Sequence, residues 1–398
     1  MRIGLEGSDF ATPASGVGQY VRALWRELQG QPGLEPVLLL PGRVDEYSDP
    51  PIGEVIAEIP PQRWATGKAR KLWWEQVGLP QAAGRAGLDL VHAPHFRLPI
   101  RRAQPYVVTI HDLVPLVMPV YANSRSMRLY LRLACATAPH ARLILTDSEH
   151  SAQDIRRLLR VPEERIRVAP LAAGAAYRPL PPDDPTIAAA RAQYGLDGPF
   201  IFNVAGMDVR KNLAALIRGF ALARTQLPAG IRLVIAGTAH SDHPDRYPDL
   251  APIVSECGLD EWVTFTGRVS DEEKVALLNA AEIYVDASLY EGFGLSPLEA
   301  MSCGTPTICS DRSSLPEVTG DGALSIEPTP EKLGAAIAFV LSTPHERREL
   351  RRRGLAQAAR FSWQRTTTET IAVYQEALAS AVQDAHGTLK RRKAGTPS

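Results

Sequence analysis

The chain has 398 residues, of which 45% are hydrophobic and 22% are charged, and its 44 basic residues balance its 44 acidic residues. This length exceeds what a single hydrophobic core usually holds and suits two domains of an ordinary globular protein. A formal net charge of zero provides no whole-molecule field that would favour nucleic acid, so no nucleic-acid partner is expected.

Strand-like apolar runs alternate with helical patterns along the whole chain, which is typical of parallel α/β sheets. In the first half, strands are expected at 2–6, 36–40, 90–92, 106–110, 143–147 and 167–169, with helices at 18–29, 73–86, 125–138 and 148–159. In the second half, strands are expected at 200–204, 232–236, 263–266, 283–287, 307–310 and 323–326, with helices at 212–227, 271–281, 297–303, 331–341 and 344–357.

A proline-rich segment separates the two halves. Residues 177–185 contain four prolines in nine positions, which predicts a stiff, extended connection. We therefore expect an N-terminal domain at 1–178 and a C-terminal domain at 186–363. A last helix is expected at about 364–383, and the basic tail at 387–398 is expected to be disordered.

The loop before the expected helix at 297–303 has the composition of a ligand-binding loop. It reads Glu291-Gly-Phe-Gly-Leu295, and Gly292 and Gly294 allow the backbone to approach a ligand closely. Phe293 and Leu295 belong to the same loop, and the amides of the helix start suit a phosphate. Glu291 is predicted to hold sugar hydroxyls. The alternative interpretation is that Glu291 is a solvated acidic residue of the loop.

The helix itself has clear start and stop signals. Ser296 is expected to cap it, Pro297 to occupy its first position and Glu299 its third, while Gly304 is expected to end it. Glu299 is predicted to bind a ribose of the ligand. The alternative interpretation is that Glu299 serves only as the acidic partner of a capping box.

Two further glycine loops follow strands and lie before helices. Gly16 and Gly18 suit a phosphate turn, but Val21 stands where the dinucleotide fingerprint requires a third glycine, which disfavours a nicotinamide dehydrogenase. Gly206 lies just before Arg210 and Lys211, a cation pair at a helix start that suits a diphosphate. The alternative for this pair is a solvated surface position.

Histidines follow two strands of the first half. His111 comes directly after the strand at 106–110 and is predicted to face a cleft, with packing or capping as its alternative. His92 and His95 either line the cleft that holds the second substrate or fill space beside Pro94.

The pattern Glu291-x7-Glu299, followed by Ala-Met-x-Cys-Gly-Thr-Pro306, resembles the retaining glycosyltransferases of family four. The resemblance implies the GT-B fold, in which two doubly wound Rossmann-like domains face each other across a cleft. It also implies transfer of a hexose from a nucleotide diphosphate sugar, GDP- or UDP-linked, to a glycan or lipid-linked acceptor. The stretch Trp73-Trp-Glu-Gln76 is similar to bacterial polysaccharide mannosyl- and rhamnosyltransferases, which favours mannose.

The same resemblance implies roles for individual residues. Lys211 matches the lysine that contacts the donor diphosphate, and His111 matches a histidine beside the transferred sugar. Many family members have an arginine where this chain has Met207, so Arg210 is the expected substitute.

Other positions follow from the resemblance alone. The backbone of Gly267 and Arg268 is expected to read the nucleotide base, and the loop with Gly16 and Gly18 to lie near the diphosphate and the acceptor. The last helix is expected to cross back to the first domain.

Two other functions remain open from the sequence. One is a nucleotide-sugar epimerase of the same fold, and the other is a non-catalytic nucleotide-sugar-binding protein. The second would be favoured by loss of Glu291, Lys211 or His111, and all three are present. No cofactor and no metal are expected, because cations and helix ends are available to stabilise a departing diphosphate.

Several features predict a cytoplasmic location. Four cysteines lack zinc-like spacing, the first residues resemble a strand rather than a signal peptide, and no run of eighteen apolar residues occurs. Residues 63–74 interleave four cations with three tryptophans, which predicts peripheral contact with an anionic membrane. The alternative places these tryptophans in the core or the acceptor cleft.

Overall fold

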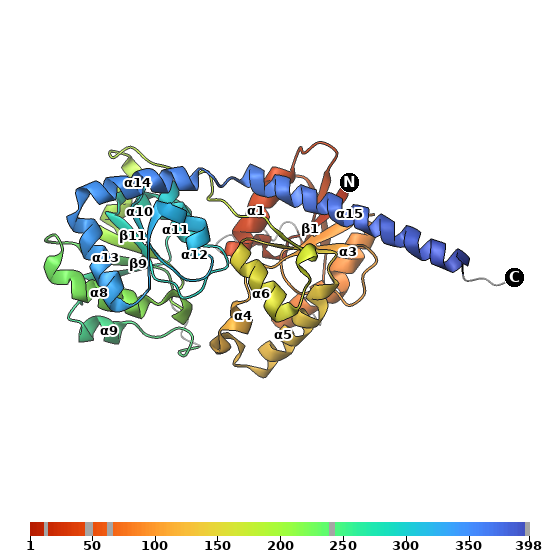
Figure 1. The fold of residues 1–398 in the computed structure, drawn as a ribbon, viewed down its shortest axis with the longest axis horizontal. Helices are drawn as coiled ribbons and strands as arrows, with labels where there is room; N and C mark the ends of the chain where they lie inside the picture. The colour runs from red at the N-terminus through yellow and green to blue at the C-terminus, as the bar shows by residue number, and fades with distance from the viewer. Residues whose placement is uncertain (12–14, 44–50, 62–66, 239–242, 395–398) are drawn as a thin grey trace. The chain divides into compact units, whose positions relative to one another are not determined.

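The chain forms two compact units in a computed structural model that describes residues 1–11, 15–43, 51–61, 67–238 and 243–394 (Figure 1). Unit 1 comprises Met1–Leu171 together with Trp363–Ser398, and unit 2 comprises Ala172–Ser362. The last segment of the chain therefore belongs to the same unit as the first. Each unit is built around its own parallel sheet.

Unit 1 contains a seven-stranded sheet in the order β3-β2-β1-β4-β5-β6-β7, with all neighbouring pairs parallel. This order is that of a doubly wound, Rossmann-like sheet. Its strands are β1 (Arg2–Glu6), β2 (Glu35–Pro41), β3 (Glu54–Glu58), β4 (Leu90–Ala93), β5 (Tyr106–Thr109), β6 (Leu143–Thr146) and β7 (Ile166–Val168). The sequence prediction missed β3, a short edge strand whose acidic ends do not form an apolar run.

The helices of unit 1 are α1 (Gly16–Leu28), α2 (Gly67–Trp73), α3 (Leu79–Arg85), α4 (Val114–Val117), α5 (Arg125–Thr137), α6 (Glu149–Leu159) and α15 (Trp363–Ala394). The single helix expected at 73–86 is interrupted, because a π-helical turn at Trp74–Gly78 joins α2 to α3. Ser148 caps α6 through a hydrogen bond from the amide of Ser151, as its position after a strand predicts.

Unit 2 contains a six-stranded parallel sheet in the order β10-β9-β8-β11-β12-β13. Its strands are β8 (Phe200–Val204), β9 (Arg232–Ala236), β10 (Val263–Gly267), β11 (Ile283–Asp286), β12 (Thr307–Ser310) and β13 (Ala323–Ile326). Its helices are α7 (Pro185–Gln193), α8 (Leu213–Ala223), α9 (Ala251–Glu256), α10 (Asp271–Ala280), α11 (Leu295–Ser302), α12 (Leu315–Thr319), α13 (Pro330–Ser342) and α14 (Pro344–Ala358).

Both faces of the unit 2 sheet are covered by core. Ile201 and Val285 belong to one buried cluster, whereas Phe202 and Tyr284, their neighbours along the same strands, belong to another. Because successive strand residues point to opposite faces, the two clusters lie on the two sides of the sheet. Strands buried on both faces are continuously apolar, which is why the sequence reveals them so clearly.

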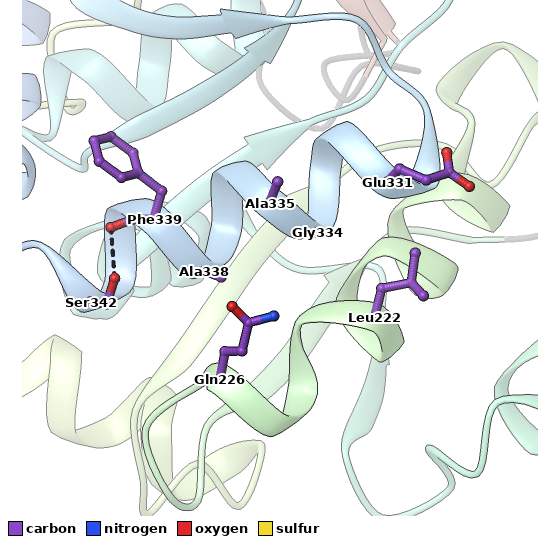
Figure 2. A pocket seen from close by; sticks show the side chains of 8 residues that line it. All are labelled: Leu222, Gln226, Glu331, Gly334, Ala335, Ala338, Phe339 and Ser342. Atoms are coloured by element: carbon purple, nitrogen blue, oxygen red, sulfur yellow. Dashed lines mark hydrogen bonds between the residues drawn. The ribbon is translucent and has the colours of Figure 1, made fainter.

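Helices α8 and α13 approach closely at a glycine pair. A Cβ atom on Gly219 would lie 2.8 Å from the carbonyl oxygen of Pro330, and one on Gly334 would lie 2.7 Å from the carbonyl oxygen of Gly219. The two helices leave a groove between them, shown in Figure 2, that is lined by Leu222, Gln226, Glu331, Gly334, Ala335, Ala338, Phe339 and Ser342. None of these is a site residue predicted from the sequence.

Helix α15 is anchored on unit 1. The hydroxyl of Tyr374 lies 2.7 Å from Nδ1 of His92, and Thr366 Oγ1 donates to the carbonyl oxygen of Pro170 at 2.5 Å. The helix extends to Ala394, whereas the sequence predicted a disordered tail from residue 387. No helix in the described ranges is long and apolar enough to cross a membrane.

Candidate active site

The carboxyl ends of β8 and β11 bring three charged residues of unit 2 together. These strands pair in parallel, so the loops that follow them leave the same edge of the sheet. After β8, a short 3₁₀ turn at Val209–Lys211 is capped by Asp208, whose Oδ1 accepts from the amide of Arg210 at 3.0 Å. The loop after β11 reaches this turn, where the amide of Leu289 donates to the carbonyl oxygen of Arg210 at 2.8 Å.

Glu291 lies between two cations. Its Oε2 is 2.5 Å from Arg210 Nη1, and its Oε1 is 2.6 Å from Lys211 Nζ. The three side chains are only 12–18% exposed, so neither the loop acid nor the cation pair is a solvated surface charge. Burial alone would raise the pKa of Glu291, but Lys211 and Arg210 outweigh burial and lower it to about 2. The carboxylate is therefore ionised at neutral pH.

Two serines hold the loop that carries Glu291. The amide of Glu291 donates to Ser313 Oγ at 2.8 Å, and Ser314 Oγ lies 2.9 Å from the carbonyl oxygen of Glu291 and 2.8 Å from that of Phe293. These serines were missed, although they belong to the same motif-rich stretch of sequence. Gly294 has a φ of 112°, and a Cβ atom there would lie 2.8 Å from Leu315 Cδ2, so the loop requires glycine.

The predicted start of the helix after this loop is wrong. Helix α11 begins at Leu295 with Gly294 as its N-cap, and no side chain caps it. The left-handed Gly294 turns the chain directly into the helix, so Ser296 already lies inside its first turn. The predicted end is confirmed, because Gly304 follows the helix with a φ of 75°.

Glu299 forms a buried ion pair instead of a capping box. Its Oε2 lies 2.5 Å from Lys274 Nζ, which comes from α10 and also lies 5.2 Å from the centre of the Tyr177 ring. Burial, together with the charge of Glu299, raises the pKa of Tyr177. Lys274 was missed because the sequence around it reads as an ordinary charged helix start. Binding of a ribose by Glu299 stays a prediction.

The other residues of unit 2 that were predicted to bind the nucleotide sugar lie at the same carboxyl edge of the sheet. Gly206 is exposed after β8, whereas Met207 is buried in the core, where an arginine would be costly. Gly267 ends β10 with a φ of 71°, and the neighbouring Arg268 is exposed. The loops after β8 and β9 meet at Gly237, a glycine that was not predicted to matter. A Cβ atom on Gly237 would lie 1.8 Å from the carbonyl oxygen of Ala205, so only glycine allows this approach.

In unit 1, His111 forms a dyad with Asp147. His111 Nδ1 lies 2.7 Å from Asp147 Oδ2, and the ring of Tyr20 contacts the imidazole edge-on at 4.7 Å between centroids. Burial lowers the pKa of His111, but the charge and hydrogen bond of Asp147 outweigh it and raise the pKa. Its Nε2 has no hydrogen-bond partner among the described residues. Asp147 directly follows β6; the sequence placed it at the end of that strand but gave it no role at the site.

His92 is a core residue, which was one of the two alternatives. Its Nδ1 lies 2.7 Å from the Tyr374 hydroxyl and its Nε2 lies 2.7 Å from Thr109 Oγ1. Burial lowers its pKa to about 3, so the imidazole is neutral. Gly16 and Gly18 lie inside the first turn of α1 rather than before it, where Ser15 Oγ accepts from the amide of Gly18 at 3.0 Å.

The tryptophans of the segment at 63–74 do not support membrane contact. Trp73 and Trp74 are buried in the core of unit 1, which is the alternative that the sequence left open. Trp64 lies outside the described residues. The indole of Trp74 donates to Glu6 Oε1 at 2.6 Å, so this side chain serves the interior of the unit.

Similar solved structures define the class of fold. Sucrose-phosphate synthase from Thermosynechococcus elongatus has a TM-score of 0.74 at 23% identity, covering 96% of this chain and 100% of that one. Anabaena HepE in complex with UDP and glucose has a TM-score of 0.72 at 17% identity, covering 94% and 100%. Together with the two parallel sheets, these similarities show the GT-B fold.

Sequence relatives show the family. A model of glycosyl transferases group 1 matches residues 187–357, and one of glycosyltransferase family 4 matches residues 14–172. O-antigen chain mannosyltransferase B of Escherichia coli is 34% identical over 72% of this chain and 74% of that protein. MMP alpha-(1->4)-mannosyltransferase of Mycolicibacterium hassiacum is 29% identical over 95% of this chain and 99% of that protein. The chain belongs to glycosyltransferase family 4 and is a glycosyltransferase.

Proposed function

We propose that the protein transfers a mannosyl group, with retention of configuration, from a nucleotide diphosphate sugar to a glycan or lipid-linked acceptor. The observation that carries the proposal is the buried Arg210–Lys211–Glu291 triad at the carboxyl edge of the unit 2 sheet. Ligands of doubly wound sheets bind at this edge.

The triad has the charges that a nucleotide diphosphate sugar needs. In the proposed complex, Lys211 and Arg210 donate to the diphosphate, because both are cations on the 3₁₀ turn that leads into α8. Glu291 accepts hydrogen bonds from the hydroxyls of the transferred sugar. The leaving diphosphate gains charge in the transition state, and cations already positioned by a buried carboxylate stabilise that charge without reorganisation.

Retention follows from attack on the same face of the sugar that the diphosphate leaves. A phosphate oxygen of the donor takes the proton of the acceptor hydroxyl, so no side chain has to act as base. His111 positions the sugar, with its ring orientation held by Asp147. Catalysis then depends on placing the reactants and stabilising the leaving group.

Mannose and a glycan acceptor are supported by relatives. The Escherichia coli and Mycolicibacterium hassiacum proteins described above are both mannosyltransferases by name, and the former acts on an O-antigen chain. GDP-mannose is therefore the donor that we propose. In the described part of the chain, no group of three or more His, Cys, Asp or Glu side chains is placed to hold a metal. We propose that the reaction needs no metal.

A donor panel tests the proposal. Purified protein is incubated with GDP-mannose, UDP-glucose, UDP-galactose and GDP-fucose, and thermal shift and nucleotide release are measured for each. GDP-mannose is expected to raise the melting temperature most and to release GDP when mannose oligosaccharides are added. Stabilisation by none of the four would refute a nucleotide-sugar enzyme, and a preference for a UDP-sugar would refute mannosyl transfer alone.

A further inference from the structure

Left-handed backbone conformations other than glycine concentrate at the candidate active site of unit 2. Among the described residues, fourteen glycines have a positive φ, and three other residues do: Arg160, Asn212 and Ser313. Arg160 directly follows α6, where a left-handed residue is common. The other two border the triad, because Asn212 follows Lys211 and Ser313 contacts Glu291. Strained backbone that gathers at one place indicates a functional demand there.

Ser313 is the less expected of these two residues. Asparagine tolerates the left-handed conformation, and Asn212 is also held by a hydrogen bond from its Nδ2 to the carbonyl oxygen of Pro328 at 2.9 Å. Serine carries the steric cost of a Cβ atom close to the following carbonyl oxygen. Glycine would remove this cost, and it occupies most of the described positions with positive φ. The serine side chain therefore provides something that glycine cannot.

The Ser313 side chain holds the backbone of Glu291. Its Oγ accepts from the amide of Glu291 at 2.8 Å. The next residue, Ser314, donates from its Oγ to the carbonyl oxygen of Glu291 at 2.9 Å. Successive side chains of an extended chain point to opposite sides, so the turn at Ser313, with a φ of 53°, allows both hydroxyls to reach one residue.

Ser313 is itself anchored on both sides. The amide of Asp311 donates to the carbonyl oxygen of Ile326, the last residue of β13, at 2.8 Å. After the turn, Leu315 begins α12 and is fully buried. The sheet and the core of unit 2 thus fix the position of Ser313, and its hydroxyl passes that position on to Glu291.

We propose that Ser313 is a positioning residue for sugar transfer that acts through Glu291. The inference rests on the proposed function, in which the carboxylate of Glu291 meets the hydroxyls of the transferred sugar. Ser313 fixes the backbone of Glu291, while Arg210 and Lys211 fix its carboxylate. The acid is then in place before the donor binds, and the strained φ of Ser313 persists because this placement requires it.

The variants Ser313→Gly and Ser313→Ala separate the hydroxyl from the backbone strain. Glycine accepts the φ of 53° without strain and alanine keeps the strain, but both remove the hydroxyl. Transfer is measured with the donor that the wild type prefers, which is GDP-mannose in our proposal. Both variants should lower kcat by about tenfold or more, the scale of a misplaced group. Ser313→Gly should melt at a higher temperature than Ser313→Ala, so the loss of rate does not follow a loss of stability.

A double-mutant cycle tests whether Ser313 acts through Glu291. The carboxylate is absent from Glu291→Ala, so the addition of Ser313→Gly should change the remaining rate by less than about twofold. GDP, which has no transferred sugar for Glu291 to hold, should bind to Ser313→Gly as it does to the wild type in isothermal titration calorimetry. A residue with a merely structural role would not show this pattern.

Arg160→Gly is the matched control. Arg160 has a φ of 54°, nearly the value of Ser313, but it is an exposed residue at the end of α6 in unit 1. Glycine at this position should raise the melting temperature and leave kcat at the wild-type value. The control shows what relief of the same strain does where no hydroxyl holds Glu291.

The outcomes separate this inference from the proposed function. A wild-type kcat in Ser313→Gly, a loss of rate confined to Ser313→Ala, additive losses in the cycle, weaker binding of GDP, or failure of both variants to fold would overturn the positioning role. Failure of the wild type to bind any of the four nucleotide sugars would overturn the proposed function, and this inference with it.

Discussion

Replacement of Glu291 by glutamine should destabilise the protein while leaving its nucleotide-binding cations in place. The carboxylate pKa of about 2 lies below an ordinary value of 4.5. A shift of this size corresponds to about 3 kcal/mol of stability at neutral pH, at about 1.4 kcal/mol per pKa unit. Glutamine loses this contribution and leaves Arg210 and Lys211 beside a neutral amide.

The sign of the pH dependence follows from the lowered pKa. The contribution is fully present above the unfolded-state pKa near 4.5, and it is lost as the pH falls through 4.5 toward 2. Urea unfolding followed by circular dichroism at pH 7 and at pH 3.5 measures it. We expect Glu291→Gln to lower the free energy of unfolding by about 3 kcal/mol at pH 7 and by less at pH 3.5.

Glu282→Gln serves as the control, because this glutamate of unit 2 is 39% exposed in its ion pair with Arg347. It should cost less than about 1 kcal/mol, as surface ion pairs do. GDP should bind to Glu291→Gln at least as well as to the wild type, because the phosphates no longer compete with a carboxylate for the cations. Wild-type stability of Glu291→Gln at pH 7, or an equal loss at both pH values, would refute the reasoning.

Three further predictions concern turnover, metal dependence and closure on donor binding. Lys211→Ala and Glu291→Ala should each lower the transfer rate by about a hundredfold or more, the scale of one positioned electrostatic contact, and folded variants with wild-type rates would show that the site is misassigned. Excess chelator should leave transfer unchanged; activity that is abolished and then restored by Mg²⁺ or Mn²⁺ would contradict this. Saturating donor should reduce the radius of gyration in small-angle scattering, as ligand closure does in two-domain enzymes, and an unchanged radius would argue against closure.

Much of the fold was determined locally by the sequence. The strands β8, β9 and β11 are buried on both faces, so each appears as an apolar run that periodicity alone reveals. The end of α11 at Gly304 was equally readable, because a left-handed position after a helix favours glycine wherever it occurs. Its start was not, since the geometry of Gly294 depends on a loop that Ser314 holds from another part of the chain.

Only the tertiary structure decides which side chains that are distant in the sequence contact each other. The sequence singled out Glu291, Lys211 and His111 by residue type and local context, but it did not show that Arg210 and Lys211 share one carboxylate or that Asp147 orients His111. These contacts arise because neighbouring parallel strands end at one edge of a sheet, and strand order is set by packing of the whole unit. Local sequence carries the chemistry of each side chain, whereas burial and strand order decide which side chains meet.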